Sequence, residues 1–400
     1  MIIFKDIAEN KIKFLKTVVV SIIYLAIGVT TSIIGPTLLD LQIAINSTLE
    51  NTGFIVPVKA FGYMIGSLSG CFVPEKSDRQ PYIICCSVMV SVVVSLIPLN
   101  RTLITLIVNI FFLGLFTGFT DMGVNSFILQ LWGKKCAPYI QIATFFYGIG
   151  AFSAPLLVEP FLLPINFEKN GNDTAKHQYT PNDLKLNTPY DALAIFLILA
   201  IILFTLIYYF FDDKLDYEKY EETNDEKDES SPKLRTVAII ILAILLKLFF
   251  GNVVTFGGYL TPFAVKSQMN LSKSTGAFMA SLFWGTFAVF KLPAALLMRF
   301  INIRLLITIQ LTLSLVSSLI LLCFGQYFEV ALWIAAAMMG LGGSSLYALF
   351  IGYIQNYIHL TNYIISVGLV GACAGEFVYP FVVAKFIDQD PAIFSLYVED

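Results

Sequence analysis

The stretch GFTDMGVNSFILQLWGKKCAPYIQIATFFYGIGAFSAPLL occupies residues 118–157. It predicts two apolar helices joined by a short basic turn at Lys134 and Lys135. The first helix carries one carboxylate, Asp121, with Asn125 one turn later on the same face. An acid at the centre of a membrane helix costs about 2.5–3.5 kcal/mol on insertion scales. Such residues usually face a bundle interior or an aqueous cavity, so Asp121 is a functional candidate, with a structural hydrogen bond as the alternative.

Composition indicates a polytopic membrane protein. Of the 400 residues, 57% are hydrophobic and 13% are charged, and the mean hydropathy is +0.77. A soluble domain carries about 25% charged residues. The net charge of −3 does not suggest nucleic acid as a partner. The sequence contains no Walker phosphate-binding loop, and no other motif supports an enzyme.

Apolar runs of about 20 residues recur along the chain, and each is long enough to cross a hydrocarbon core about 30 Å thick. We therefore expect an all-α membrane fold with about eleven spans, at residues 17–38, 53–73, 81–98, 103–131, 138–163, 190–211, 235–264, 274–298, 303–324, 328–355 and 362–386. The tail from Pro391 starts apolar again and resembles the opening of a twelfth span that the chain lacks.

Charge predicts that the N-terminus is cytoplasmic. Fifteen lysines and arginines fall in segments placed inside, against six outside and four within spans, which follows the positive-inside rule. All four glycosylation sequons lie in loops placed outside, where glycans are added: Asn46, Asn100, Asn172 and Asn270. The six cysteines lie in spans or at their cytoplasmic ends, so we expect free thiols. The expected location is the plasma membrane.

Three regions are predicted: an N-terminal six-helix half at 1–211, an acidic cytoplasmic linker at 212–234 that we expect to be disordered, and a C-terminal half at 235–400. The two halves are related in sequence. The matched pairs, at offsets of 223 to 226, are Gly35 with Gly258, Gly114 with Gly340, Gly150 with Gly375, and Pro155 with Pro380. A parallel repeat of two halves is an architecture of membrane transporters.

The chain resembles the major-facilitator family that includes sodium-dependent glucose transporters, the "domain-containing protein 4" group. The resemblance covers nearly the whole chain and rests on residues 118–157, GPTLLDLQ (35–42), FWGTFA (283–288) and VGACAGEFVYPFVV (370–383). It implies two pseudo-symmetric six-helix halves and a solute transporter, with sugar and sodium as the leading ligands. The chain departs from the family pattern where Thr144 replaces a histidine, in the missing twelfth span, and in a degraded loop at 70–79.

The predicted substrate-binding residues are Asp121, Asn125, Gln141, Asn252, Trp284, Tyr347 and Glu376, with Asp121 and Glu376 also coupling a cation. Glu376 lies mid-span, and Tyr347 matches Asp121 across the repeat at an offset of 226. The amides offer the paired donor and acceptor that sugar hydroxyls need. Trp284 offers a stacking face, although tryptophan also serves as an interfacial anchor. A helix-packing hydrogen bond is the alternative role for Glu376.

We expect a secondary active transporter, with sodium-coupled hexose uptake by alternating access as the leading function. Its partners would be a small polar solute and the lipid bilayer, with no cofactor apart from Na⁺ as coupling ion. Two alternatives stay open: a proton-coupled or facilitative transporter of another solute, and a non-transporting membrane scaffold or receptor. Asp40 and Lys59 lie near the outer ends of spans one and two, where we expect solvated charges, with a gate pair between them as the alternative.

Overall fold

The computed structural model describes residues 10–69, 77–133, 136–164, 179–211, 232–297, 300–354, 357–358, 362–388 and 394. Within these ranges the regular structure is helical, as expected where lipid leaves the backbone no other hydrogen-bond partner. The N-terminal elements are α2 (Lys11–Ser32), α3 (Ile34–Ala44), α4 (Leu49–Gly53), α5 (Ile55–Ser69), α6 (Gln80–Leu96), η2 (Ile97–Leu99), α7 (Leu103–Trp132), α8 (Cys136–Val158), η4 (Glu159–Phe161) and α9 (Asn187–Phe210). The C-terminal elements are α10 (Pro232–Lys266), α11 (Lys273–Leu297), α12 (Ile303–Phe324), α13 (Glu329–Gly343), α14 (Leu346–Ile354) and α15 (Asn362–Phe386).

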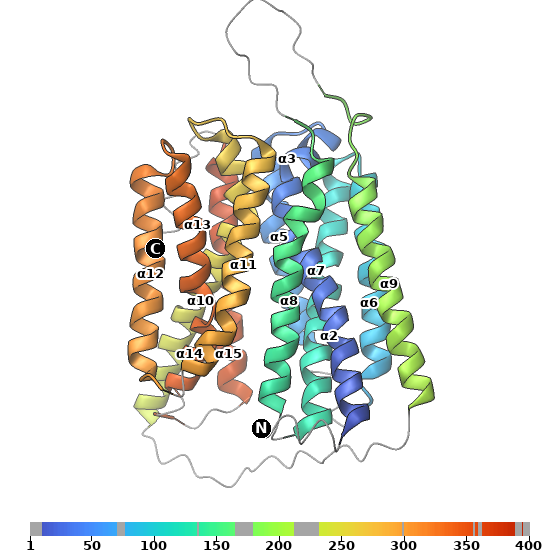
Figure 1. Ribbon diagram of the computed structural model, residues 1–400, viewed down its shortest axis with the longest axis vertical. Coiled ribbons are helices and arrows are strands. Elements are labelled where there is room, and N and C mark those ends of the chain that lie inside the picture. The colour runs from blue at the N-terminus through green and yellow to red at the C-terminus, as the bar shows by residue number, and fades with distance from the viewer. Residues whose placement is uncertain are drawn as a thin grey trace, which may run out of the picture.

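The helices form two bundles that stand side by side, with α2 to α9 in one and α10 to α15 in the other (Figure 1). Each predicted span coincides with helical residues. By length and apolarity, eight helices among the described residues qualify individually as membrane spans. The fold is therefore an all-helical multi-pass membrane fold, and the number of eleven spans stays a prediction.

Two predicted spans are broken helices. The first is interrupted at Ile33, where α2 gives way to α3. Pro36 accounts for this break, because its ring nitrogen cannot donate to the carbonyl of residue 32. The tenth is interrupted at Ser344 and Ser345, directly after Gly342 and Gly343, residues that weaken helix continuity. Hydropathy does not detect either break, since both segments stay apolar throughout.

The matched glycines occupy equivalent packing positions in the two halves. A Cβ at Gly114 of α7 would lie 2.1 Å from the Lys59 carbonyl oxygen of α5, and one at Gly340 of α13 would lie 2.4 Å from the Phe283 carbonyl oxygen of α11. Gly150 of α8 approaches α2 in the same way as Gly375 of α15 approaches α10. Small residues let membrane helices come this close, so the sequence repeat corresponds to a repeat in packing.

Gly35 and its repeat partner Gly258 meet between the halves. A Cβ at Gly35 of α3 would lie 2.5 Å from the Gly257 carbonyl oxygen and 3.4 Å from the Gly258 Cα of α10. Residues related by a two-fold axis can contact each other only close to that axis. The α3–α10 contact therefore marks the line about which the two halves are related.

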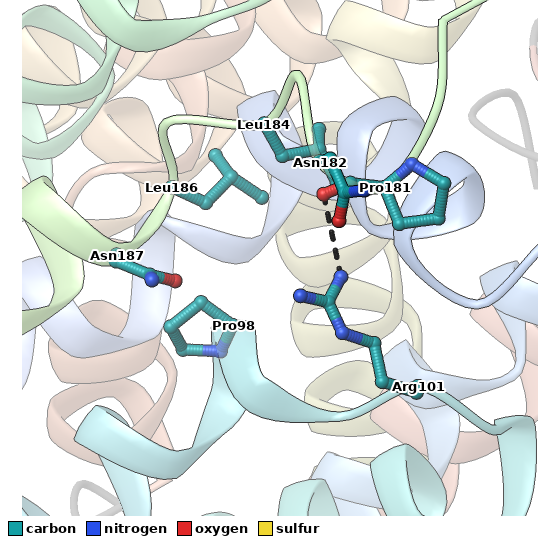
Figure 2. Close-up of a pocket in the computed structure, with 7 residues that line it drawn as sticks. All are labelled: Pro98, Arg101, Pro181, Asn182, Leu184, Leu186 and Asn187. Carbon is teal, nitrogen blue, oxygen red and sulfur yellow. Dashed lines mark hydrogen bonds between the residues drawn. The ribbon is translucent and has the colours of Figure 1, made fainter.

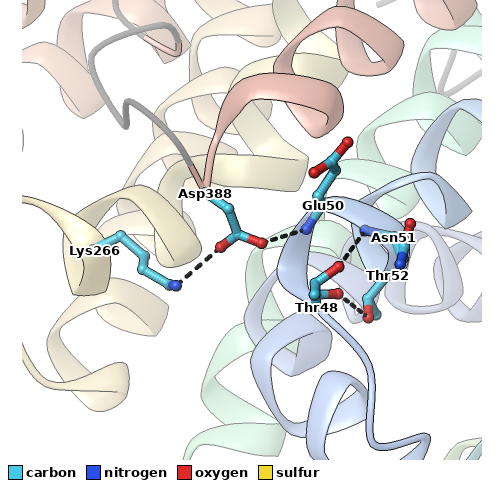
Figure 3. A network of polar contacts seen from close by, with 6 residues as sticks. All are labelled: Thr48, Glu50, Asn51, Thr52, Lys266 and Asp388. Carbon is cyan, nitrogen blue, oxygen red and sulfur yellow. Dashed lines mark hydrogen bonds and ion pairs between the residues drawn. The ribbon is translucent and has the colours of Figure 1, made fainter.

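Polar contacts join the halves at the end of the bundle that is predicted to lie outside. The Asp388 carboxylate, after α15, accepts a hydrogen bond from the backbone nitrogen of Glu50 in α4, at 2.7 Å, and pairs with Lys266 of α10 at 3.0 Å (Figure 3). The Tyr259 hydroxyl of α10 donates to the carbonyl oxygen of Gly53 at 2.8 Å. The Ser274 hydroxyl of α11 donates to Glu159 of η4. The two halves are thus tied together by hydrogen bonds at this end.

Several expectations concern residues outside the described ranges. The linker prediction falls largely on 212–231, although α10 already starts at Pro232, three residues before the predicted span. Asn172 and Cys71 also lie outside these ranges, while the five described cysteines are free thiols. Near the C-terminus, Phe394 is buried, with its ring 4.8 Å from that of Phe263 and 5.6 Å from that of Phe256, both in α10.

Candidate functional site

Asp121 lies in the middle of α7, where its carboxylate accepts hydrogen bonds from three side chains. The hydroxyl of Tyr24 in α2 donates to one carboxylate oxygen, and the hydroxyl of Tyr63 in α5 donates to the other. The Asn125 amide nitrogen lies 3.1 Å from a carboxylate oxygen and 3.0 Å from the Asp121 carbonyl oxygen. These donors are all neutral, so they solvate the carboxylate without cancelling its charge.

Glycines position the two tyrosines. Gly62 and Gly66 of α5 face Gly114 and Gly118 of α7, with carbonyl oxygens 2.1 to 2.3 Å from where Cβ atoms would be. This close approach brings the Tyr63 hydroxyl within reach of α7. Gly28 of α2 packs in the same manner on the Tyr147 carbonyl of α8, and the ring centroids of Tyr24 and Tyr147 are 5.4 Å apart.

Lys59 and Glu376 add one positive and one negative charge to the site. The Lys59 ammonium of α5 donates to the Thr31 carbonyl oxygen of α2, at 3.2 Å, and interacts electrostatically with Glu376 of α15. Glu376 also lies within electrostatic range of Asp121. Lys59 is half-buried, so the expectation of a solvated end charge was wrong for this residue, and so was its pairing with Asp40.

The structure brings four predicted site residues together and leaves three elsewhere. Asp121 of α7, which is hydrogen-bonded to Asn125, lies within electrostatic range of two residues from the C-terminal half, Tyr347 of α14 and Glu376 of α15. Gln141 is exposed near the start of α8 and makes no hydrogen bond to this group. The substrate and cation roles of all these residues stay predictions.

Asn252 and Trp284 line the interior of the C-terminal half. Trp284 of α11 is only 6% exposed and packs on Gly257, Phe283 and Phe287, so its ring offers no open face here. Its indole nitrogen and the Asn252 amide oxygen are buried without a hydrogen-bond partner among the described residues. A buried polar atom left unpaired costs about 1–3 kcal/mol. Both atoms are therefore available to a polar ligand or to water.

Sequence reasoning missed Tyr24, Tyr63 and Tyr147 as members of the site. The available signal was the spacing of Lys59 and Tyr63, four residues apart and therefore on one helix face. Tyrosine is common in membrane proteins at interfacial positions, so the residue type alone did not indicate an interior role.

Asp40 is buried rather than solvated. Its carboxylate, 0% exposed on α3, forms an ion pair with Lys273, 4% exposed at the start of α11. The other carboxylate oxygen accepts a hydrogen bond from the Leu163 backbone nitrogen, at 3.1 Å. The expectation of a solvated Asp40 was wrong, because a lysine from the other half of the molecule covers it.

A surface hollow lies away from this group of side chains. It has a volume of about 170 Å³ and opens between the turn before α7 and the segment leading into α9 (Figure 2). The Arg101 guanidinium donates to the Pro181 carbonyl oxygen across it, at 3.3 Å. It is lined by Pro98, Arg101, Pro181, Asn182, Leu184, Leu186 and Asn187, none of which is a predicted site residue.

Around Asp121 the side chains offer oxygen atoms from two sources, a carboxylate and two phenol hydroxyls, and the Asn125 amide nitrogen donates to the carboxylate. Hard cations prefer oxygen ligands. The same carboxylate can instead take up a proton. Asp121 therefore provides a carboxylate that can take up a cation or a proton, next to hydroxyl and aromatic side chains.

Comparison with known proteins gives three findings. A sequence model described as the Major Facilitator Superfamily matches residues 20–380. The human sodium-dependent glucose transporter 1 is 27% identical over 377 residues, covering 90% of this chain and 71% of that protein. The Danio rerio major facilitator superfamily domain-containing protein 4A is 25% identical over 425 residues, covering 91% and 80%.

Solved structures share the fold at low sequence identity. The inward-open structure of the xylose transporter XylE from E. coli aligns with a TM-score of 0.71 at 12% identity, covering 97% of this chain and 94% of that chain. A structure of the nucleoside transporter NupG aligns with a TM-score of 0.69 at 11% identity, covering 97% of both chains. At such identities the likeness is one of fold.

Proposed function

Because this chain belongs to the major facilitator superfamily, whose members are transporters rather than enzymes, we propose that it moves a small polar solute by sodium-coupled alternating access, with a hexose as the leading solute. Relatives in human, mouse and Xenopus laevis, 24–27% identical, are named sodium-dependent glucose transporters. We place the protein in the plasma membrane with its N-terminus in the cytoplasm.

The observation that carries the proposal is the group of side chains around Asp121. A carboxylate that accepts hydrogen bonds from two tyrosine hydroxyls in the middle of α7 lies within electrostatic range of Tyr347 and Glu376 of the other half. A cation bound there would favour the arrangement of the halves in which the site is complete. If the solute favours the same arrangement, the two bindings are coupled, and no further contact between them is needed.

A polar solute is supported by the unpaired groups of the C-terminal half. The Asn252 amide oxygen, the Thr255 hydroxyl and the Trp284 indole nitrogen are buried without partners among the described residues. Hydroxyl groups of a sugar can both donate and accept, so they match this mixed set. At the predicted outer end, hydrogen bonds and an ion pair join α3, α4 and η4 of one half to α10, α11 and the residue after α15 of the other. Contacts that close one end of the molecule are what rocking of the two halves requires, so they support alternating access.

A proton is the second candidate for the coupling ion. It is favoured by the hydrogen bonds of Asp121, because a carboxylate that accepts from two hydroxyls needs no rearrangement of its ligands to take up a proton. A facilitative carrier or a non-transporting scaffold would need neither ion.

The test is uptake of a radiolabelled solute panel into proteoliposomes that contain the purified protein. Hexoses, pentoses, nucleosides and amino acids are each offered with a sodium gradient, with a pH gradient and with neither. We expect hexose accumulation that depends on the sodium gradient. Accumulation of amino acids but not hexoses would refute the hexose proposal, and dependence on the pH gradient alone would replace sodium by a proton.

Asp121→Asn should fold and reach the membrane but lose cation-driven accumulation. Asparagine keeps the size of the side chain and its ability to hydrogen-bond with Tyr24 and Tyr63, while it removes the charge that attracts a cation. The measurement is solute uptake with and without the gradient. Asp191→Asn, which changes an exposed acid on α9, is the matched control and should retain accumulation. Normal gradient-driven uptake by Asp121→Asn would give the acid a structural role only.

A further inference from the structure

The helices α5 and α15 pack against each other across the two halves. Two ring pairs mark their contact: Phe54 with Phe381, with centroids 5.1 Å apart, and Phe61 with Phe377, with centroids 6.0 Å apart. Along the chain Lys59 lies between Phe54, directly before α5, and Phe61 of α5, and Glu376 directly precedes Phe377 on α15. The two charged residues therefore belong to the two helices that form this contact, one from each half, and they lie within electrostatic range of each other.

The charges of this site do not balance. Asp121 and Glu376 supply two carboxylates. Among the residues that the structure describes, Lys59 is the one positively charged side chain that interacts electrostatically with either carboxylate. Lys59 interacts with Glu376, whereas the groups that contact Asp121 are the neutral donors Tyr24, Tyr63 and Asn125. Within the described ranges, no hydrogen-bond donor contacts the Glu376 carboxylate, so its compensation comes from the nearby ammonium alone.

We propose that Lys59 is the built-in counter-ion of Glu376 and thereby sets the number of coupling cations at one, bound at Asp121. This inference rests on the proposed transport function. An uncompensated charge away from water is costly, and the electrostatic attraction of Lys59 lowers that cost for Glu376, whereas the groups that contact Asp121 are neutral. The empty site therefore lacks a single positive charge. One monovalent cation, sodium or a proton, supplies it.

Lys291 of α11 provides the internal comparison. It is also half-buried in a predicted span, and its ammonium lies 4.8 Å from the centroid of the Phe287 ring. In the described part of the chain, neither Asp121 nor Glu376 interacts with it. A contact of this type stabilises an ammonium without neutralising an acid. Lys291 thus has the same side chain as Lys59 but leaves the charge balance of the site unchanged.

The test compares Lys59→Met, Glu376→Gln and the double variant, all as full-length purified protein. The first readout is the thermal unfolding temperature in detergent, which needs no transported solute. Each single change leaves one charge without its partner, so each should lower the unfolding temperature. The double variant should recover most of that loss, because the pair is removed together. Lys291→Met with and without Glu376→Gln is the matched control, and here the second change should give no recovery.

The second readout is the number of cations that move with each solute in proteoliposomes, taken from the ratio of labelled cation and solute fluxes. We expect one for the wild type and for the double variant, two for Lys59→Met, and gradient-independent uptake for Glu376→Gln. Separate sodium and pH gradients identify the cation. Losses in unfolding temperature that add in the double variant would overturn the proposal, as would an unchanged cation number in Lys59→Met.

Failure of the transport proposal is distinguishable from failure of this one. If no solute is taken up by the wild type, the transport function falls. The counter-ion role of Lys59 is then decided by the unfolding temperatures alone, with additive losses counting against it and recovery in the double variant counting for it.

Discussion

Two phenol hydroxyls lower the free-energy cost of a charge on Asp121. A hydrogen bond to a charged group contributes about 1.5–3 kcal/mol, against about 0.5–1.5 kcal/mol for a neutral one. The bonds from Tyr24 and Tyr63 together can offset the cost of about 2.5–3.5 kcal/mol for an acid within a membrane helix. These bonds lower the cost of a charge on Asp121, and a bound cation or a proton would lower it further.

Tyr63→Phe should lower the free energy of unfolding by about 1.5–3 kcal/mol, because it removes a donor to a charged carboxylate. Tyr190→Phe is the matched control: its hydroxyl is also buried in the N-terminal half but bonds to the neutral Thr37 hydroxyl, at 2.8 Å, so its loss should cost about 0.5–1.5 kcal/mol. Denaturant or thermal unfolding in sodium-free detergent measures both. Sodium should then restore more stability to Tyr63→Phe than to the wild type.

Equal losses for the two tyrosine variants would argue against an ionised Asp121. A smaller effect of sodium on Tyr63→Phe than on the wild type would instead assign the Tyr63 oxygen as a ligand of the cation.

The sequence indicated the acids of the site but not their partners. Asp121 and Glu376 stand out because a carboxylate within an apolar run of about 20 residues has few explanations. Tyr24 and Tyr63 come from two other helices, and their direction depends on close packing at Gly62 and Gly114 that no single-helix pattern reveals. Lys59 was judged by its position along the helix, whereas its surroundings are set by α15, which lies more than 300 residues further along the chain.

At the level of helices, the apolar runs predicted where helices occur, and the glycine matches predicted which positions pack alike. Pro36 was visible in the sequence, but a proline in a span can either kink the helix or begin a new one. The sequence therefore did not indicate that the first span is divided into two helices. The pairing of α5 with α15 and of α8 with α11 depends on how two separately folded halves dock. Nothing local in the sequence encodes that docking.

Gly35→Ala should shift the protein away from the arrangement seen here. The added Cβ would lie 2.5 Å from the Gly257 carbonyl oxygen, so α3 and α10 must move apart. Asn46 and Asn270 are exposed, and one lies in each half. Spin labels attached at these two positions, in a chain whose native cysteines are replaced, report the separation of the halves by pulsed electron paramagnetic resonance. The distance distribution should move to longer values.

Gly258→Ala is the control on the partner side of the same contact. There the new Cβ would meet a Val56 methyl carbon at 3.3 Å, which a small side-chain shift relieves, so the distribution should stay close to that of the wild type. Equal distributions for all three proteins would show that the α3–α10 contact does not control the outer end.

The sequons coincide with helix caps. The hydroxyl residues of three sequons, Thr48, Thr102 and Ser272, cap the next helix by accepting from backbone nitrogens at 3.2, 3.3 and 3.0 Å. Asn46 and Asn270 adopt φ of 49° at the preceding turn, a conformation that asparagine tolerates. Asparagine followed by a capping serine or threonine therefore arises from turn chemistry, and sequons alone are weaker evidence for glycans than their number suggests.

For the molecule as a whole, the sidedness of the membrane insertion can be tested through these sites. We expect Asn46→Gln and Asn270→Gln each to remove one glycan, seen as a loss of one glycosidase-sensitive mobility step on a gel. Asn100→Gln should have a smaller effect, because the Asn100 amide nitrogen is bonded to the Leu96 and Ile97 carbonyl oxygens, at 2.9 and 3.1 Å. If the wild-type chain resists glycosidase and a tag inserted within residues 165–178 is found on the cytoplasmic side, the predicted orientation is reversed.

The same end of the molecule carries two ion pairs that differ in burial. Asp40 and Lys273 are 0% and 4% exposed and belong to opposite halves, whereas Lys266 and Asp388 are 38% and 23% exposed and belong to the same half. Breaking a buried pair from one side costs about 3–5 kcal/mol, since the remaining charge is left without a partner. An exposed pair contributes about 0–1 kcal/mol. The Asp40–Lys273 pair should therefore dominate closure of the predicted outer end.

Asp40→Asn should open that end, because separating the halves returns the Lys273 ammonium to water. Each 1.4 kcal/mol changes a population ratio tenfold. The ratio of open to closed molecules, measured from the distances between labels at Asn46 and Asn270, should therefore rise roughly a hundredfold or more. The double variant Asp40→Leu with Lys273→Met removes both charges and should close again, while Lys266→Met should change little. If Lys266→Met opens the outer end as far as Asp40→Asn does, burial is not what makes the Asp40–Lys273 pair the lock between the halves.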